Sequence, residues 1–407
     1  MRGSFAWDTK DPLTVSTEWD VIILGAGAAG LMCAMTAGSR GRRVLVLDHA
    51  RRAGEKIRVS GGGHCNFTNL HAGPRHYLSE NARFCQTALR AYSPRDFIAL
   101  VDRHAIRHID KGGGAIFCEG PADNIVAMLL DECRKHGVTF LQETAIRKVE
   151  RDAEGFLVRT SRGDWHGASL VVALGGRAMP KLGATGLGYD IARRFGLRII
   201  PERPGLTPLL LGPESGPGWS GLAGISLRAR AMCGTTGFTD AMLFTHRGLS
   251  GPAILRLSSH WQPGTELLID LAPEIDLFAH LQMARQSHPR QAASSALGRF
   301  LPGRLATHLA ARAGVDGHLA EIGNQRLRAL TDTVHRLRLL PSGTGGYARA
   351  EVTVGGVDTL QLDPATMACR TVAGLYFVGE VVDVTGCLGG FNLQWAWSSG
   401  YVAGQAV

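Results

Sequence analysis

Uninterrupted apolar runs are the clearest pattern in this chain. Residues 20–24, 43–47, 170–174 and 374–378 consist mainly of aliphatic and aromatic residues. Such runs are typical of parallel strands that are buried on both faces of a sheet. Helical patterns lie between and after them, over residues 81–91, 123–136 and 393–406. This arrangement predicts an α/β fold built around a buried sheet.

Shorter patterns add strands at the side of this sheet. Residues 138–141 form a further predicted strand, and residues 145–149 and 156–160 are separated by turn residues, which predicts an antiparallel meander. A glycine cluster at 183–188 opens a predicted helix that ends near residue 195. Because the cluster does not directly follow the strand at 170–174, we interpret it as a helix start and not as a second nucleotide site.

A change of composition divides the chain. Residues 201–221 are rich in proline and glycine, which is typical of a domain boundary. Strands are predicted over 222–232 and 242–244, and an amphipathic helical pattern covers 275–340. We therefore predict a first segment over 1–205, an insert over 206–343, and a last segment over 344–407. Within the insert, a small β unit (206–270) precedes a helical part (271–343).

The turn after the first predicted strand carries the sequence Gly-Ala-Gly-Ala-Ala-Gly at 25–30. In a GxGxxG turn, Gly25 allows the sharp bend, Gly27 lets a pyrophosphate approach the backbone, and Gly30 lets helix and strand pack closely. The helix that begins near Ala28 offers free amides and a positive dipole end to the phosphates. Asp48 ends the second strand, where it can accept a hydrogen bond from a ribose hydroxyl. The pattern predicts a dinucleotide site.

Two further glycine-rich segments extend this prediction. Residues 54–69 include three successive glycines followed by His-Cys-Asn, a loop suited to the close approach of a flat ring system, with Asn66 at its polar edge. The strand at 374–378 ends in Gly379-Glu380, where a carboxylate can accept hydrogen bonds from a polyol such as ribityl. Residues 386–392 then open the final helix. Because these elements lie far apart in the chain, we predict FAD as the cofactor rather than NAD.

Composition and charge narrow the function classes. The apolar fraction of 45% and the charged fraction of 19% are typical of a folded, soluble protein. The net charge is +9, but the basic residues are mostly scattered arginines, so we do not expect nucleic acid among the partners. The eight cysteines form no CxxC pair, which favours a reduced compartment and argues against a metal site or a dithiol.

The location follows from the absence of targeting signals. No apolar run reaches the length of a membrane span. The first 19 residues are polar and contain no apolar signal core, so we expect a frayed tail and a cytoplasmic protein.

Three long motifs give the chain a specific resemblance. They are residues 60–69 (SGGGHCNFTN), 243–252 (LFTHRGLSGP) and 374–392. On these motifs the sequence strongly resembles the BaiN/YhiN-type family of FAD-dependent flavoproteins. The resemblance implies a discontinuous Rossmann-like FAD-binding domain of the two-dinucleotide-binding type, with an inserted β-barrel plus helical domain. It also implies that one branch of the family reduces a conjugated double bond in bile-acid-like steroids.

The resemblance also assigns residues to the flavin. It carries Gly62, Gly63, Cys65 and Asn66 to the flavin face, and places residues from 380 to 392 at the ribityl and pyrimidine end. The complete set predicted to bind the cofactor is Gly25, Gly27, Ala28, Ala29, Gly30, Asp48, Lys56, Ser60, Gly62, Gly63, Cys65, Asn66, Gly175, Gly379, Glu380, Asp383, Gly390, Phe391 and Asn392.

We therefore predict a flavin oxidoreductase that takes hydride from NAD(P)H and reduces an activated double bond of a small organic substrate. His246 is the candidate proton donor, or alternatively a structural histidine of the insert. Cys65 is a candidate redox thiol, or alternatively a small residue beside the ring. Two other functions stay open. One is a flavin-dependent tRNA-modifying enzyme, and the other is a flavin-binding sensor without turnover. The substrate, the choice between NADH and NADPH, and the oligomeric state do not follow from the sequence.

Overall fold

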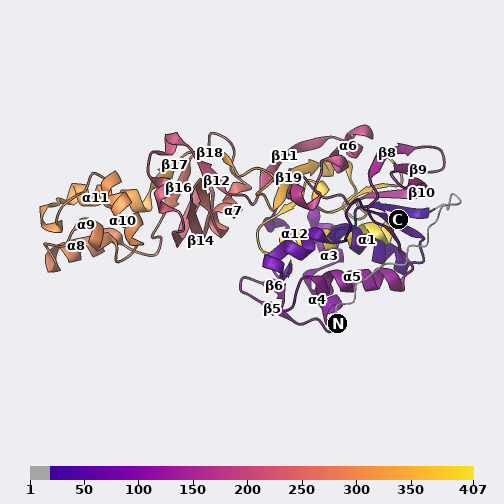
Figure 1. Ribbon diagram of the computed structural model, residues 1–407, viewed down its shortest axis with the longest axis horizontal. Helices are drawn as coiled ribbons and strands as arrows, with labels where there is room; N and C mark the ends of the chain where they lie inside the picture. The colour runs from indigo at the N-terminus through magenta and orange to yellow at the C-terminus, as the bar shows by residue number, and fades with distance from the viewer. Residues whose placement is uncertain (1–18) are drawn as a thin grey trace.

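The computed structural model describes residues 19–407. Both ends of the chain form a larger α/β part, and the insert extends from it along the longest axis of the molecule (Figure 1). Each part has its own hydrophobic core. One core joins residues between Val21 and Leu197 to residues between Val357 and Val407, and the other lies between Leu209 and Leu339. The predicted frayed tail falls outside the described residues except for Trp19, which begins the first strand.

The central sheet has the order β7-β2-β1-β10, with β20 on the other side of β10. Its strands β1 (Trp19–Leu24), β2 (Val44–Leu47), β7 (Thr139–Leu141) and β20 (Leu375–Phe377) all run parallel to their neighbours. Most of their apolar side chains are completely buried, and only Trp19, Phe140 and Tyr376 are partly buried, as the continuous hydrophobic runs predicted. The chain therefore carries a Rossmann-like α/β fold.

The strand predicted at 170–174 is longer and begins earlier, as β10 (Gly163–Val172). Its first half pairs antiparallel with β9 (Phe156–Thr160), which in turn pairs with β8 (Ile146–Arg151). Only its second half pairs with β1 and β20. The first half is partly exposed at residues 163–166 and so lacks the apolar run by which buried strands are found.

Helix α1 (Ala28–Ser39) contacts both α12 (Phe391–Ala406) and α5 (Asp123–Lys135). The remaining helices of this part are α2 (Glu55–Val59), α3 (Cys85–Ala91), α4 (Pro94–Arg103) and α6 (Leu187–Arg194). Three small sheets complete it. They are β3 (Asn66–Asn69) with β6 (Ala115–Cys118) and β5 (His108–Asp110), β4 (Tyr77–Leu78) with β21 (Thr385–Gly386), and β11 (Ile199–Gly205) with β19 (Val352–Val357).

The insert contains a seven-stranded antiparallel sheet in the order β17-β16-β13-β14-β15-β12-β18. Its strands are β12 (Leu209–Leu211), β13 (Ser226–Cys233), β14 (Thr236–Thr245), β15 (Gly248–Ser250), β16 (Leu267–Asp270), β17 (Leu337–Leu339) and β18 (Pro341–Thr344). Its two edge strands, β17 and β18, are separated by only one residue in the chain. They follow the helical part, so the sheet includes residues beyond the predicted 206–270 unit.

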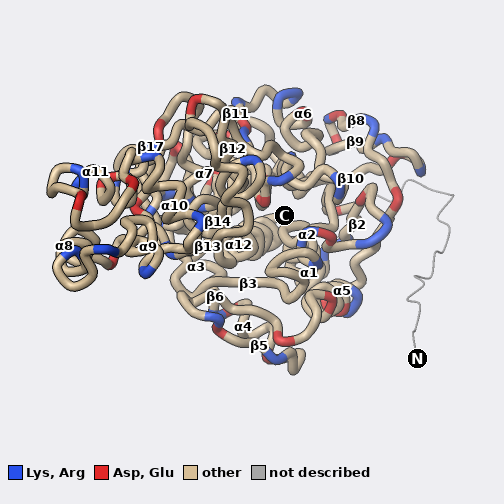
Figure 2. The backbone as a smooth tube through the Cα atoms, turned by 60° about the vertical axis from the view of Figure 1, so that its left-hand side comes forward, with Lys and Arg blue, Asp and Glu red and all other residues tan. Residues whose placement is uncertain are grey.

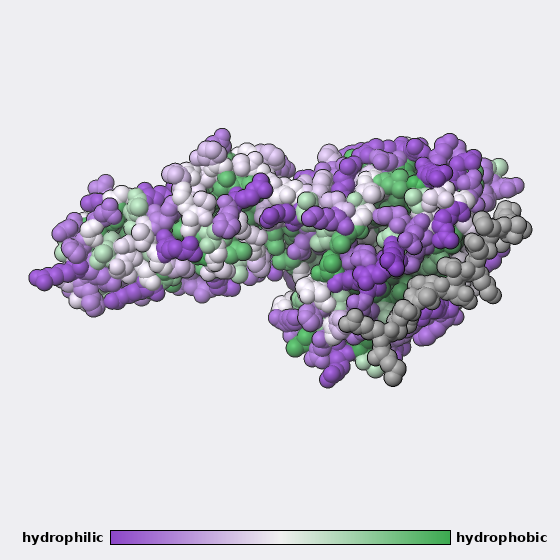
Figure 3. Space-filling view, in the orientation of Figure 1, coloured by the Kyte–Doolittle hydropathy of each residue, from purple (hydrophilic) through white to green (hydrophobic). Residues whose placement is uncertain are grey.

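Helix α7 (Pro252–Ser258) packs on this sheet, and the outer end of the insert is helical (Figure 1). The single helical pattern over 275–340 corresponds to four helices, α8 (Leu277–Ser287), α9 (Ala293–Leu297), α10 (Gly303–Arg312) and α11 (Asn324–His335). Hydrophilic residues cover much of this outer end in Figure 3. Among residues 19–407, no helix combines the length and the apolar character needed to cross a bilayer.

Candidate functional site

A cavity of about 760 Å³ lies where the two ends of the chain and the insert meet. Its walls include the turn between β1 and α1, residues from Asp48 to Gly62, and residues 173–175. The opposite walls come from residues 378–380 and from the start of α12, while Leu206, Asp240 and Arg256 approach from the insert. Its volume lies in the range of ordinary cofactor and ligand sites.

The β1–α1 turn has the geometry that its glycines predict. Gly25 has a φ of +104°, and a Cβ on Gly30 would lie 1.9 Å from the carbonyl oxygen of Gly25. By contrast, no atom lies within 4 Å of the Cβ position of Gly27, which lines the cavity beside Ala28 and Ala29. The N-terminus of α1 therefore opens onto free space, as a phosphate site requires.

Asp48 lies in the cavity wall at the end of β2. Its carboxylate accepts hydrogen bonds from the backbone N–H of Ala26 (2.6 Å) and of Ala50 (2.7 Å). These bonds fix the side chain beside the glycine turn. Each carboxylate oxygen has further acceptor capacity, so a ribose hydroxyl can still donate to it.

Glu380 lies in the cavity wall with both of its oxygens held. Lys56 Nζ lies 2.7 Å from Oε2, and the backbone N–H of Thr353 donates to Oε1 at 2.8 Å. Lys56 and Gly175 line the same wall. Glu380 and Lys56 together form a polar, charge-balanced patch, which suits hydroxyl groups better than an apolar ring.

The glycine loop forms another wall. Gly61, Gly62 and Gly63 all have positive φ, and a Cβ on Gly61 would lie 2.8 Å from the ring of Phe117. Gly62 and Asn66 line the cavity together with Ser60. This wall lies close to the start of α12, because a Cβ on Gly390 would lie 2.4 Å from the carbonyl oxygen of Thr68.

Cys65 and Gly63 are not among the described residues that line the cavity. The Cys65 side chain is completely buried, and this burial raises the pKa of its thiol to about 12. A thiol with such a pKa remains protonated at neutral pH and is a poor nucleophile. Burial and this raised pKa favour a packing role for Cys65 over the redox role, which stays a prediction.

Asn392 lines the cavity, but its side chain faces its own loop. Its Oδ1 accepts from the N–H of Gly386, and its Nδ2 donates to the carbonyls of Gly386 (2.8 Å) and Cys387 (3.3 Å). The side chain thus holds the 386–390 loop in place. Hydrogen bonds to a ligand at this wall would instead come from the first amides of α12, which lack acceptors within the helix.

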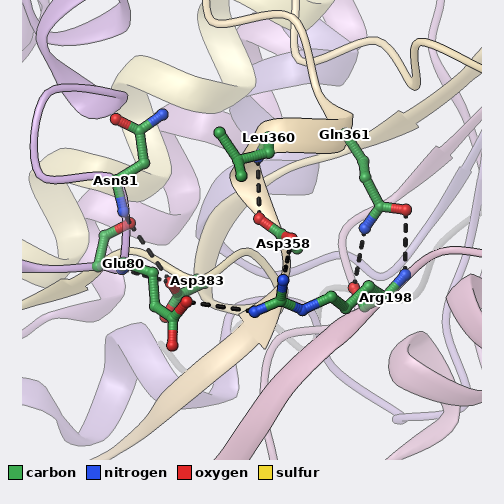
Figure 4. Close-up of polar contacts among 8 residues, drawn as sticks. Glu80, Asn81, Arg198, Asp358, Leu360, Gln361 and Asp383 are labelled. Atoms are coloured by element: carbon green, nitrogen blue, oxygen red, sulfur yellow. Dashed lines mark hydrogen bonds and ion pairs between the residues drawn. The ribbon is translucent and has the colours of Figure 1, made fainter.

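Asp383 and Phe391 lie outside the described cavity wall. Asp383 accepts hydrogen bonds from the N–H of Glu80 (2.9 Å) and from Ser79. Burial raises the pKa of its carboxyl. Arg198 pairs with Glu80 (3.2 Å) in the same network (Figure 4). The contacts of Asp383 are thus structural. The ring of Phe391 stacks on His76 with a centroid distance of 4.7 Å.

His246 is also absent from the described cavity wall. It is exposed in the turn between β14 and β15. The insert reaches the cavity instead through Asp240, in the middle of β14, and through Pro252 and Arg256 on α7. The proposed proton transfer by His246 thus lacks support from the geometry.

Sequence reasoning missed the charged groups where the insert meets the cavity. Arg256 lies 3.3 Å from Asp240, and its Nε is buried without a partner among the described residues. Glu351 also lines the cavity and is exposed, its carboxyl has no hydrogen bond or ion pair in the described part of the chain, and desolvation by the surrounding protein raises its pKa. We call Asp240, Arg256 and Glu351 the seam residues. The one signal in the sequence for this group was the position of Glu351, an acidic residue directly before the buried strand β19.

The residues of the cavity fit FAD. The open helix end at Gly27 suits a pyrophosphate, Asp48 suits a ribose, and Glu380 with Lys56 suits a ribityl chain. The wall at Gly62 and Gly390 leaves room for a flat ring system, and the seam residues lie where the insert closes the cavity.

Comparisons with known proteins agree with this geometry. Residues 19–406 match the model of the HI0933-like protein Rossmann domain. The chain is 46% identical to the ribosomal RNA dihydrouridine synthase of Escherichia coli (strain K12), over 95% of this chain and 98% of that protein. It is 28% identical to the 3-dehydro-bile acid delta(4,6)-reductase of Clostridium scindens, over the same shares.

A solved structure shows the same fold. It is the 3-ketosteroid-delta4-(5alpha)-dehydrogenase from Rhodococcus jostii RHA1, which aligns with a TM-score of 0.51 at 14% identity over 97% of this chain and 98% of that one. Our expectation that nucleic acid is not a partner finds no support, because a close relative is named for ribosomal RNA. The chain belongs to the HI0933-like family, which includes the BaiN/YhiN-type FAD-dependent flavoproteins, and it is a flavin-dependent oxidoreductase.

Proposed function

We propose that this protein reduces uridine to dihydrouridine in ribosomal RNA, with FAD as the cofactor and NAD(P)H as the electron donor. The observation that carries the proposal is the 46% identity, over nearly the full length of both chains, to a ribosomal RNA dihydrouridine synthase. The proposal joins two hypotheses that the sequence suggested separately, namely reduction of an activated double bond and flavin-dependent modification of RNA, with ribosomal RNA in place of the transfer RNA expected there.

The chemistry of uridine fits such a site. The C5=C6 bond of uracil is conjugated with the C4 carbonyl, so hydride added at C6 moves negative charge toward O4, and a proton must then be added at C5. When bound, FAD supplies the hydride, which it first takes from NAD(P)H. The protein has to bind the base, stabilise the charge at O4 and deliver the proton.

The seam residues are suited to these tasks. Arg256 carries several N–H donors and cannot lose its charge. It lines the cavity beside Asp240, so its positive charge can stabilise negative charge on a substrate oxygen there. Glu351 lines the cavity with a carboxyl that is unpaired among the described residues and whose pKa is raised, a change that favours the protonated form needed by a proton donor. We assign charge stabilisation to Arg256 and protonation of C5 to Glu351.

Reduction of a steroid enone is the rival function, because it needs the same hydride and proton transfers. It is favoured by the 28% identical bile acid reductase. That identity is lower over a similar share of the chain, so we favour ribosomal RNA.

The proposed substrate can be tested in cells. Deletion of the gene should remove dihydrouridine from ribosomal RNA, as measured by mass spectrometry of its nucleosides, and should leave the dihydrouridine of transfer RNA unchanged. Reintroducing the wild-type gene should restore it. Unchanged dihydrouridine in ribosomal RNA after deletion would contradict the proposal.

The placement of FAD predicts an effect of Gly27→Val. The added side chain would fill the space proposed for the pyrophosphate, so the purified variant should contain less than about a tenth of the wild-type FAD. Gly323→Val is the matched control, because Gly323 also precedes a helix and has no atom within 4 Å of its Cβ position. The measurement is flavin absorbance per protein. Equal FAD content in both variants would refute this placement.

The role of Glu351 predicts a pH dependence. Its proton is available only below its raised pKa, so the rate of substrate reduction should fall as the pH rises through that value. Glu351→Gln should slow this step about 10²–10⁴-fold, the usual contribution of a general acid, and should remove the alkaline fall. Stopped-flow absorbance of the reduced flavin measures the step, with FAD content and flavin reduction by NAD(P)H as controls. A variant that keeps the wild-type pH profile would exclude Glu351 as the donor.

A further inference from the structure

The helical part of the insert is rich in arginine and contains no lysine. Residues 277–340, which carry its four helices, contain nine arginines and three carboxylates, a net charge of +6. Figure 2 shows basic positions recurring along α8–α11. Only Arg336 and Arg338 among these arginines pair with a carboxylate in the described part of the chain.

Helix α10 carries part of this charge in a single row. Arg304, His308 and Arg312 are spaced four residues apart, so they lie on one face, and the row covers about 12 Å. Burial and the neighbouring Arg312 lower the pKa of His308, so the row owes its charge to the two arginines. Both are exposed.

Arg304, Arg312 and a third arginine, Arg247, all lie beside residues 211–223 of the insert. Arg304 donates to the carbonyls of Gly221 (2.8 Å) and Ala223 (3.2 Å). The guanidinium of Arg312 lies over the ring of Trp219, at 5.5 Å from its centroid. At the other end of the segment, the carbonyl of Arg247 accepts from the N–H of Leu211.

We call Arg247, Arg304 and Arg312 the arginine surface. All three are exposed, and none of them pairs with a carboxylate among the described residues. The segment 211–223 that they border contains a single carboxylate, Glu214, and α10 contains none. The surface also includes the turn of the LFTHRGLSGP motif, whose His246 and Arg247 lie outside the cavity.

The distance between the arginine surface and the cavity defines the kind of ligand that can contact both of them. Asp240 lines the cavity, and Thr245, at the end of the same strand, precedes the turn that carries Arg247. Five residues of extended strand span about 17 Å. A free nucleoside in the cavity cannot reach the arginine surface, whereas a folded RNA segment of several nucleotides can. Arginine forks also match phosphate oxygens in geometry and charge.

We infer that the arginine surface docks the phosphate backbone of a folded ribosomal RNA segment, while one uridine of that segment enters the cavity at the seam residues. This inference rests on the proposed function. It assigns to the arginine surface the selection of RNA over free uridine, and to the cavity the chemistry. An enzyme that acts on a base in folded RNA must also take that base out of its stack.

The test is a binding measurement on the FAD-loaded protein. The probe is protein-free ribosomal RNA from cells that lack the gene, and filter binding is followed from 50 to 200 mM salt. Arg304→Glu combined with Arg312→Glu should weaken binding at least 10-fold and lower the slope of log K against log salt by about 2, since two phosphate contacts are lost. Arg90→Glu combined with Arg95→Glu makes the same charge change on α3 and α4 and should alter binding less than 3-fold.

FAD content shows whether each variant is folded. A second variant keeps the test valid if the double variant of α10 misfolds. Arg247→Glu alters an exposed side chain that makes no hydrogen bond or ion pair among the described residues, and it should weaken binding at least 3-fold. If the arginine-surface variants bind RNA like the control pair, the inference is wrong, whether or not the protein makes dihydrouridine. If they lose binding while the wild-type protein leaves uridine unchanged, the docking surface stands and the proposed reaction falls.

Discussion

The close contact between the first and the last helix is the constraint on which the cavity depends. Gly400 and Gly404 of α12 face α1, and a Cβ on Gly400 would lie 2.4 Å from the carbonyl oxygen of Ala29. Helix α12 also forms hydrogen bonds with the segments that build other walls of the cavity. Trp395 donates to the carbonyl of Gly379, and Trp397 donates to the carbonyl of Phe67. The glycine turn at the start of the chain, the glycine loop and the carboxylate at Glu380 thereby surround one space. None of these segments could form that space alone.

The insert divides the work between two regions of the molecule. The α/β part holds nearly all the groups that fit FAD, and its polar groups are largely fixed by backbone hydrogen bonds, as at Asp48 and Glu380. The insert contributes Asp240 and Arg256, which pair at 3.3 Å and line the cavity. Charge stabilisation and substrate choice are thus assigned to a part of the chain that is separate from the cofactor-binding fold.

The sequence predicted best what depends on local backbone geometry. The buried strands, the glycine turn and the bent loop at residues 61–63 each need particular residues at neighbouring positions, so they can be found from one segment. The seam residues could not be found in this way, because Asp240, Arg256 and Glu351 come together only through the packing of the insert. For a related reason the sequence could not show which way the side chains of Cys65, Asp383 and Asn392 point. Asn392 lines the cavity and the other two lie near it in the sequence, but the fold buries the Cys65 thiol and bonds Asp383 and Asn392 to protein groups.

The central claim is that the flavin of this protein passes its electrons to uridine in ribosomal RNA. The most direct measurement is a single turnover without oxygen, in which the reduced FAD-loaded protein is mixed with protein-free ribosomal RNA from cells that lack the gene. Flavin absorbance and the dihydrouridine formed are then measured together. Our account predicts that one dihydrouridine forms for each flavin reoxidised, and that a 3-keto steroid enone reoxidises the flavin far more slowly. Rapid reoxidation by the steroid with none by the RNA would contradict it.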